Sequence, residues 1–411
     1  MNTATGTDDT HAKPKPSFGK LAVRRTLIAI VLMLLIVIPS VIMLAISHQP
    51  AAMWASMGTI VGIVTVVYGG LRVGLVTALV LALLAPVGIV AGVTPITGAA
   101  LMALMAIAVG GLSRIGMNRI VMLVPIFVAW PMMAPTPWLP TATIEKLQAY
   151  ISAHGLTLDR VSQVPAGGSA SAASAKLLSH MGPSSLVAER MDSTYLAWTA
   201  AYFFVGAVIP IVVLAVALRK FTPPKLKSHP RSESMPYTIA ITILLTVATY
   251  YFLDHPKQTA GAFMIATILV LCQVGDGNAL RPTVQRVLGT LGGGLIVWVI
   301  ASQLDSVKII DAFGAPLPVQ MFILGVVFGV AALISKFSPR AWIYYIFITP
   351  TAVCFNAFTV KMAGNVGEQR VIDNLVGAAL VLVATGLTLG FAHWGSRLQR
   401  SAPAGTPAPP A

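Results

Sequence analysis

The chain has 411 residues, of which 56% are hydrophobic and only 10% are charged, and its mean hydropathy is +0.83. This composition leaves too little polar surface to enclose a water-soluble core, which excludes an ordinary globular protein. The net charge is +14, but the basic residues are dispersed singly and in pairs between apolar segments, which argues against a nucleic-acid partner. We therefore expect an all-α fold, a polytopic transmembrane helical bundle in the lipid bilayer; strand-like alternation is absent.

The apolar segments begin after a polar and basic stretch of 25 residues. The first run, Thr26 to Ile46, is longer than the ~7–15 residues of a signal-peptide core, which predicts a retained membrane span. Similar segments follow along the chain, and together they predict about 12 spans. The expected spans cover residues 26–47, 53–69, 71–92, 97–112, 118–135, 194–218, 237–253, 260–275, 283–302, 317–335, 340–356 and 371–392.

Basic residues alternate between the two sides of this predicted bundle. With a cytoplasmic N-terminus, 19 of the 27 lysines and arginines fall on cytoplasmic segments or their flanks, and every such segment carries at least one. Cytoplasmic loops retain Lys and Arg preferentially, so the pattern predicts that both termini are cytoplasmic. For most single cations, a topological role is the expected one.

The two halves of the chain share short similarities. The segment "HQPAAMWASMGTIVGIV" (48–64) parallels "DHPKQTAGAFMIATILV" (254–270), and "LRVGLVTALV" (71–80) parallels "VQRVLGTLGGG" (284–294). These pairs predict two six-span repeats, which are parallel because each contains an even number of spans, with a translocation path between them. A chance match of short apolar segments is the alternative.

The predicted organisation has five parts. They are a cytoplasmic tail (1–25), a first repeat (26–218) with an outward-facing loop (136–193), a cytoplasmic linker (219–236), a second repeat (237–392) and a cytoplasmic Pro/Ala-rich tail (393–411). The loop either docks a periplasmic partner or is a passive connector.

The sequence contains no recognisable nucleotide-binding, hydrolase or metal-binding motif. It has no Walker pattern and no hydrolase elbow, and its Cys and His residues lack metal-ligand spacing. Cys272 and Cys354 both fall in predicted spans, where they are expected to pack against neighbours. We therefore expect no enzyme activity, no cofactor and no metal.

The stretch "ALRPTVQRVLGTLGGG" (279–294) places two arginines before a glycine-rich run. Arg281 and Arg286 bracket the start of the ninth span, with Asp276 nearby. A guanidinium held partly out of water can bind a carboxylate through two hydrogen bonds, which makes these residues candidates for a substrate path. In the alternative interpretation they are topology signals, and Asp276 neutralises one of them.

The glycine-rich run itself predicts close helix packing, because small residues let helix backbones approach in lipid. Direct contact with a ligand is the alternative. The residues concerned are Gly289, Thr290, Gly292 and Gly293.

Prolines interrupt the predicted fifth and eleventh spans at corresponding places in the two halves. Pro125 and Pro131 lie in one and Pro350 in the other, and such paired interruptions free backbone groups for binding. Aromatic residues near these interruptions can stack on an aromatic ligand, although interfacial anchoring is the commoner role. The remaining path candidates are therefore Arg340, Tyr344, Tyr345, Pro350, Trp54 and Phe263.

Acidic residues are absent from the centres of the predicted spans, where proton-coupling carboxylates usually lie. Asp192 and Asp373 stand at the starts of the sixth and twelfth spans, in roughly equivalent places, and are the candidates for coupling. Helix N-capping is the alternative for both.

The repeat and the "RPTVQRVLGTLGGGLI" stretch resemble the fusaric acid resistance and aromatic acid exporter family. Its Arg followed by Gly-Thr-x-x-Gly matches Arg286 and residues 289–293, and a second element matches Arg370, Asp373 and Gly377. The resemblance implies an inner-membrane efflux component that exports aromatic or other organic acids, often beside a periplasmic adaptor (membrane fusion) protein. Unlike longer exporters, this chain has no large cytoplasmic domain between the halves.

Three hypotheses follow. The leading one is a secondary transporter that exports organic anions. The second is a passive anion channel, because midplane carboxylates are missing and distant plant relatives of the family are anion channels. The third is a non-transporting membrane subunit that organises a complex through residues 136–193. A homo-oligomer is a further candidate assembly.

Overall fold

Helices form all the regular secondary structure in the part of the chain that the structure describes. The structure is a computed structural model, and it describes residues 18–47, 50–133, 191–217, 219, 222–255, 261–272, 274, 280–307, 317–336, 340–356, 368 and 370–386. The expected all-helical fold class is confirmed for these residues. Several predicted features lie outside the described residues. They are Asp276, most of the loop 136–193, residues 1–17 of the N-terminal tail and the whole C-terminal tail 393–411.

The helices of the first half are α1 (Phe18–Ser47), α2 (Trp54–Ala91), α3 (Pro95–Leu112), α4 (Asn118–Val121), α5 (Leu123–Met133) and α8 (Ser193–Ala217). Two short 3₁₀ turns, η1 (Pro50–Met53) and η2 (Ser113–Ile115), accompany them. The helices of the second half are α9 (Arg231–Asp254), α10 (Gly261–Leu271), α11 (Leu280–Val307), α13 (Leu317–Ser335) and α14 (Ala341–Asn356), followed by a helical segment over residues 370–386.

Six of the described helices are long and apolar enough to cross a membrane. Four shorter apolar helices lie at 118–133, 261–271, 323–335 and 341–354. The chain is therefore a multi-pass membrane protein, while the count of twelve spans stays a prediction. The candidate spans leave many large apolar side chains exposed, as expected for surfaces that face lipid.

Helix α2 covers two of the predicted spans, 53–69 and 71–92, without an intervening loop. Its 38 residues include Gly70, whose φ of 80° and ψ of 178° are not helical. Glycine adopts a positive φ without a steric penalty, so the chain changes direction at the boundary between the two predicted spans.

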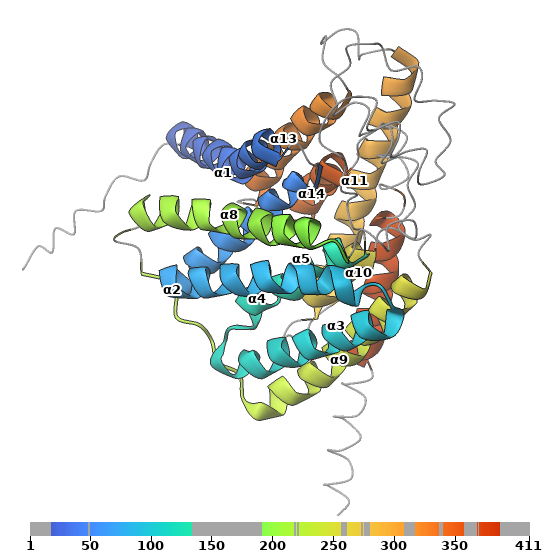
Figure 1. Cartoon of the computed structure of the whole chain (residues 1–411). Helices are drawn as coiled ribbons and strands as arrows, with labels where there is room; N and C mark the ends of the chain where they lie inside the picture. Colours follow the sequence, from blue (N-terminus) through green and yellow to red (C-terminus); the bar gives the residue numbers. More distant parts are fainter. Residues whose placement is uncertain are drawn as a thin grey trace, which may run out of the picture.

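Helices α2 and α8 lie side by side in the first half (Figure 1). Small residues make this approach close: a side chain at Gly62 would meet the carbonyl of Ala207, and one at Gly206 would meet the backbone of Ala55. The Thr59 hydroxyl also lies 2.9 Å from the Gly206 carbonyl oxygen, to which it donates. Packing and short polar contacts of this kind hold helices together where lipid removes the hydrophobic driving force.

Helix α5 of the first half packs on α10 of the second, and two further helix pairs also join the halves. Helix α1 packs on α13, where Gly329 faces the Met33 sulfur, and α3 packs on α9, where Gly110 faces Thr238 (Figure 1). In each of these two pairs, the first predicted span of one half lies against the fourth predicted span of the other. The buried apolar core is continuous from α2 and α5 to α9 and α10.

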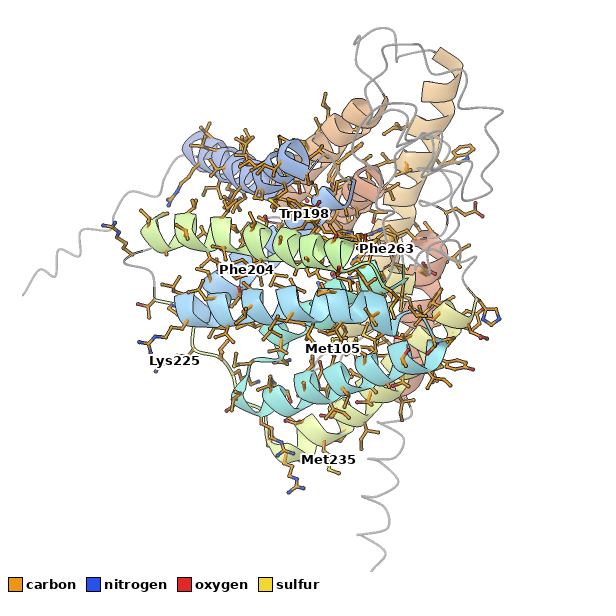
Figure 2. All side chains as sticks on the ribbon, viewed as in Figure 1. Met105, Trp198, Phe204, Lys225, Met235 and Phe263 are labelled. Carbon is orange, nitrogen blue, oxygen red and sulfur yellow. The ribbon has the colours of Figure 1, made fainter. Side chains whose placement is uncertain are left out.

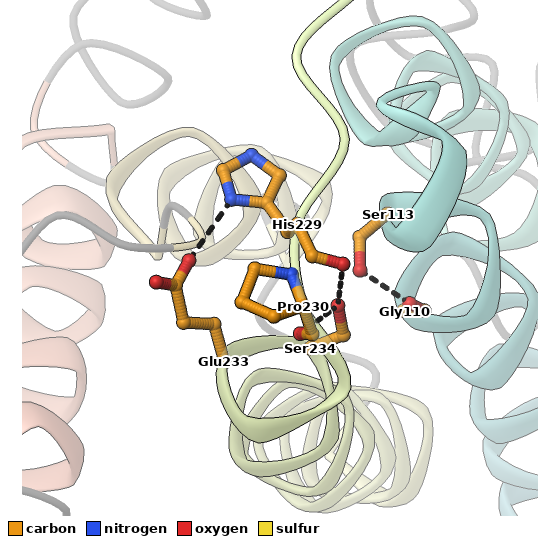
Figure 3. A network of polar contacts seen from close by, with 6 residues as sticks. All are labelled: Gly110, Ser113, His229, Pro230, Glu233 and Ser234. Carbon is orange, nitrogen blue, oxygen red and sulfur yellow. Dashed lines mark hydrogen bonds and ion pairs between the residues drawn. The ribbon is translucent and has the colours of Figure 1, made fainter.

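A polar network lies where the linker enters α9 (Figure 3). The His229 Nδ1 and Glu233 Oε2 atoms are 3.1 Å apart, and the Ser234 hydroxyl donates to the Pro230 carbonyl oxygen at 3.0 Å. On the facing helix end, the Ser113 hydroxyl donates to the Gly110 carbonyl oxygen at 2.6 Å. An acid in the first turn favours a helix start, and α9 accordingly begins six residues before the predicted span.

A methyl group added at the α2–α8 contact should destabilise the protein. Gly206→Ala would place its Cβ against the Ala55 backbone, which cannot move without separating the helices, so we expect a loss of about 1–3 kcal/mol in unfolding free energy. Thermal unfolding in detergent micelles measures the effect.

Gly111→Ala is the matched control, because nothing lies within 4 Å of its added Cβ and alanine favours a helix by up to about 1 kcal/mol. An equal melting temperature for the two variants would contradict the packing role of Gly206.

Candidate functional site

A buried polar cluster lies among α10, α11, α14 and the helical segment 370–386. Arg286 and Arg370 are each only 9% exposed, and Asp373 and Asn374 are 3% and 2% exposed. Thr267 on α10 is fully buried beside them. Phe263, which is labelled in Figure 2, marks this region of the molecule. Charged side chains are rarely buried unless they are paired or functional, so this cluster is the candidate site.

Asn374 connects the members of the cluster. Its Oδ1 accepts hydrogen bonds from the Arg286 Nε, at 3.1 Å, and from the Thr267 hydroxyl, at 2.8 Å. Its Nδ2 donates to the Arg370 carbonyl oxygen at 2.8 Å. One carboxamide thus ties α10, α11 and the segment 370–386 together.

Thr267 completes the contacts of Arg286. The Arg286 Nη2 donates to the Thr267 hydroxyl oxygen at 3.1 Å. The same hydroxyl has two acceptors within 2.8 Å, the Asn374 Oδ1 and the Phe263 carbonyl oxygen, but it carries one hydrogen and serves one acceptor at a time. Arg286 is therefore held by two neutral side chains.

Aromatic rings flank both guanidinium groups. The guanidinium carbon of Arg370 lies 4.2 Å from the centroid of the Phe263 ring, and that of Arg286 lies 5.4 Å from the Tyr345 ring. Both distances are within the range of cation–π attraction. The Phe263 ring in turn forms a T-shaped pair with Trp130 of α5, with 4.6 Å between ring centroids.

Two atoms of the cluster have no hydrogen-bond partner among the described residues. They are the Arg370 Nε and the Asp373 Oδ2, and no ion pair joins these two residues there. Leaving a buried charged group without its hydrogen bonds costs free energy, so an unpaired donor and acceptor in one place indicate a group that serves a ligand or a proton.

Glycines allow this arrangement by bringing α11 against α14. A side chain at Gly289 would meet the Trp342 carbonyl oxygen at 2.6 Å, and one at Gly293 would meet that of Ile346 at 2.6 Å. Gly292 faces the Ile346 side chain, and Pro350 borders Gly293. Arg286 precedes Gly289 by one helical turn and so lies on the face of α11 that meets α14.

The structure brings several of the predicted path residues together. Arg286, Phe263 and Tyr345 all contact the cluster, and the coupling candidate Asp373 belongs to it. Tyr344 packs edge-on against Tyr345 with 5.4 Å between ring centroids. The small residue Thr290 is buried one turn from Arg286.

Other candidates lie elsewhere. Arg281 and Arg340 are exposed, at the starts of α11 and α14. Trp54 packs in the first half against Tyr195 and Phe203 of α8, with 6.1 Å and 6.2 Å between ring centroids.

Asp192 also lies apart, at the start of α8. Its Oδ1 accepts a hydrogen bond from the backbone N–H of Thr194 at 2.9 Å, which is the geometry of a helix cap. The two coupling candidates therefore differ in their surroundings, since only Asp373 is buried beside arginines.

Three residues of the cluster had no site role in the sequence analysis: Thr267, Arg370 and Asn374. Threonine is common in spans, and Arg370 had been named only as part of the family-like element with Asp373 and Gly377. The available signal was the spacing of Arg370, Asp373 and Asn374, which puts three polar groups on one face at the start of an apolar span.

The cluster has two basic groups and one acidic group, so it carries an excess of positive charge when all three are ionised. Within the described residues, no set of three His, Cys, Asp or Glu side chains could hold a metal ion. Donors that converge beside aromatic rings favour a small organic anion as the ligand.

The region of the chain that matches a known protein family contains the buried polar cluster. Residues 243–384 match the family model described as "Fusaric acid resistance protein-like", which confirms the resemblance found in the sequence. The match spans α10, α11, α13, α14 and all five members of the cluster. No curated protein and no solved structure matches the chain. The matched region, like the rest of the described chain, is built of apolar helices, and its similarity is to a membrane transport-related family.

Removal of the Thr267 hydroxyl should weaken the cluster. Thr267→Val keeps the shape of the side chain but deprives Arg286 of an acceptor, so we expect a loss of about 1–3 kcal/mol in unfolding free energy. Denaturant titration in mixed micelles is a suitable measurement. Thr246→Val is the control, because that hydroxyl bonds only to the Thr242 carbonyl of its own helix, and we expect a change within about 0.5 kcal/mol. Similar losses in both variants would refute the bond's contribution.

Proposed function

From this family similarity, we propose that the protein is a secondary transporter of the bacterial inner membrane that exports aromatic or other organic acid anions, which it leaves chemically unchanged. The observation that carries the proposal is the pair of buried arginines, Arg286 and Arg370, held by neutral partners and flanked by aromatic rings.

The chemistry of the cluster suits a carboxylate. A guanidinium presents its N–H donors as a planar fork that matches the two oxygens of a carboxylate. The unpaired Nε of Arg370 provides a donor for such a ligand. The rings of Phe263 and Tyr345 provide apolar surface for the body of an aromatic acid.

The direction of transport is consistent with the membrane potential. When an organic anion leaves a cell with a negative interior, about 2.3 kcal/mol of free energy is released per elementary charge for each ~100 mV of membrane potential. We assign any coupled proton exchange to Asp373, because one of its oxygens lacks a hydrogen-bond donor and it is buried one helical turn from Arg370. Asp192 takes no part in the exchange, since it caps α8.

Two parallel six-span repeats are part of the proposal. The reciprocal pairs α1–α13 and α3–α9 are what a twofold axis along the membrane normal would produce. The repeats differ in charge, because Arg72 aligns with Arg286 but is exposed. The anion site therefore belongs to the second repeat.

In this proposal both termini are cytoplasmic and the loop 136–193 faces the periplasm. This orientation follows from the bias of Lys and Arg toward cytoplasmic segments. The loop is then available to a periplasmic adaptor protein.

Loss of the Arg286 charge should slow transport strongly. In liposomes loaded with unlabelled benzoate, we expect wild-type protein to drive counterflow of radiolabelled benzoate. Arg286→Gln should lower the initial rate at least about tenfold, because a hydrogen bond from a charged group to the carboxylate is worth about 1.5–3 kcal/mol and about 1.4 kcal/mol corresponds to a factor of ten. Arg72→Gln, the exposed counterpart in the other repeat, should keep the wild-type rate.

Other outcomes would reject the proposal. Anion conductance without counterflow would indicate a passive channel, and no flux of any anion would indicate a non-transporting subunit. Full counterflow by a well-folded Arg286→Gln protein would refute the site.

Orientation can be tested with single cysteines in a variant that lacks Cys272 and Cys354. In spheroplasts, a membrane-impermeant maleimide should label Ser171→Cys in the loop, but should label Ser401→Cys near the C-terminus only after permeabilisation. The reverse pattern would contradict the proposed topology.

A further inference from the structure

We propose that Asn374 determines the charge selectivity of the cluster: its neutral carboxamide holds Arg286 in place of a carboxylate, so the positive charge remains available to an anion. The inference rests on the proposed function and deepens it.

Asn374 occupies the position that a counter-ion would take. It is 2% exposed, and its Oδ1 accepts from the Arg286 Nε at 3.1 Å. A buried arginine is usually paired with an acidic side chain, which satisfies its hydrogen bonds and cancels its charge together. Asn374 satisfies a hydrogen bond and leaves the charge.

The orientation of the carboxamide is set by its partners. Its oxygen faces two donors, the Arg286 Nε and the Thr267 hydroxyl, and its nitrogen faces an acceptor, the Arg370 carbonyl. The flipped amide would oppose donor to donor at Arg286 and acceptor to acceptor at Arg370, which excludes it. An oxygen acceptor therefore stands beside Arg286, as the oxygen of an aspartate would.

Within the described part of the cluster, the acidic member Asp373 does not supply a counter-charge to Arg286. Asp373 makes no ion pair among the described residues, and its Oδ2 has no hydrogen-bond partner there. Asn374 bonds to the Arg286 side chain and to the Arg370 backbone, so both basic residues lie around one carboxamide. An added carboxylate at position 374 would balance two positive groups with two negative groups and remove the excess that attracts an anion.

The test compares two ligands of the same shape, benzoate and benzamide, which differ in charge. Asn374→Asp is nearly isosteric, and in purified full-length protein we expect it to lower the ratio of benzoate affinity to benzamide affinity at least about tenfold, because like charges in one site repel. Asn374→Ser removes the carboxamide without adding charge and should change that ratio by less than about twofold.

A purely structural role for Asn374 predicts a different result. Asn374→Ser would then reduce the binding of both ligands at least as much as Asn374→Asp, and neither variant would change the ratio. That result would overturn the inference while leaving wild-type transport, and hence the proposed function, intact. If wild-type protein itself showed no saturable benzoate binding, the proposed function would fail and the inference with it.

A second variant keeps the test decisive if Asn374→Asp does not fold. Thr267→Asp places a carboxylate at the other side-chain acceptor of Arg286, where the Nη2 contact is 3.1 Å. It should lower the ratio in the same direction, and an unchanged ratio in folded Thr267→Asp protein would contradict the inference.

Discussion

A guanidinium group buried in an apolar interior must find hydrogen-bond acceptors, and the structure around Arg286 depends on that constraint. Its Nε and Nη2 bond to side chains from two other helical segments, Asn374 and Thr267. Each bond is worth little in water but is expensive to lose in a medium that offers no replacement. The relative positions of α10, α11 and the segment 370–386 are therefore linked through one side chain.

Small residues make this link geometrically attainable. Gly289 and Gly293 let α11 approach the backbone of α14, and Gly377 lies against Thr267, where an added Cβ would meet its Cγ2 atom at 3.1 Å. Larger side chains would hold the helices apart and take Arg286 out of reach of its acceptors. The same packing brings Tyr345 and Phe263 against the two guanidinium groups. The close packing of these helices thus places both the hydrogen-bonding groups and the aromatic rings around the arginines.

The two halves of the chain use similar helix contacts for different ends. Gly58, Gly62 and Gly206 bring α2 and α8 together around apolar and aromatic side chains, with Trp54 stacked near Phe203. The second half buries two arginines in the same kind of environment. Arg72 and Arg286 illustrate the difference, because similar sequence surroundings leave one exposed and the other buried. Among the described residues, the buried arginines therefore lie in the second half of the chain.

The sequence alone was sufficient to predict the helical class, the membrane location and the resemblance to the fusaric acid resistance family over residues 243–384, because each depends on composition or on short local patterns. It placed a boundary between two spans at residue 70, where the structure has the non-helical Gly70. It also indicated Arg286, Phe263, Tyr345 and Asp373. Tertiary structure was needed to separate them from Arg281 and Trp54 and to add Thr267, Arg370 and Asn374. The reason is physical: an arginine next to a span can extend to water or turn inward, and only the acceptors on neighbouring helices decide which conformation costs less free energy.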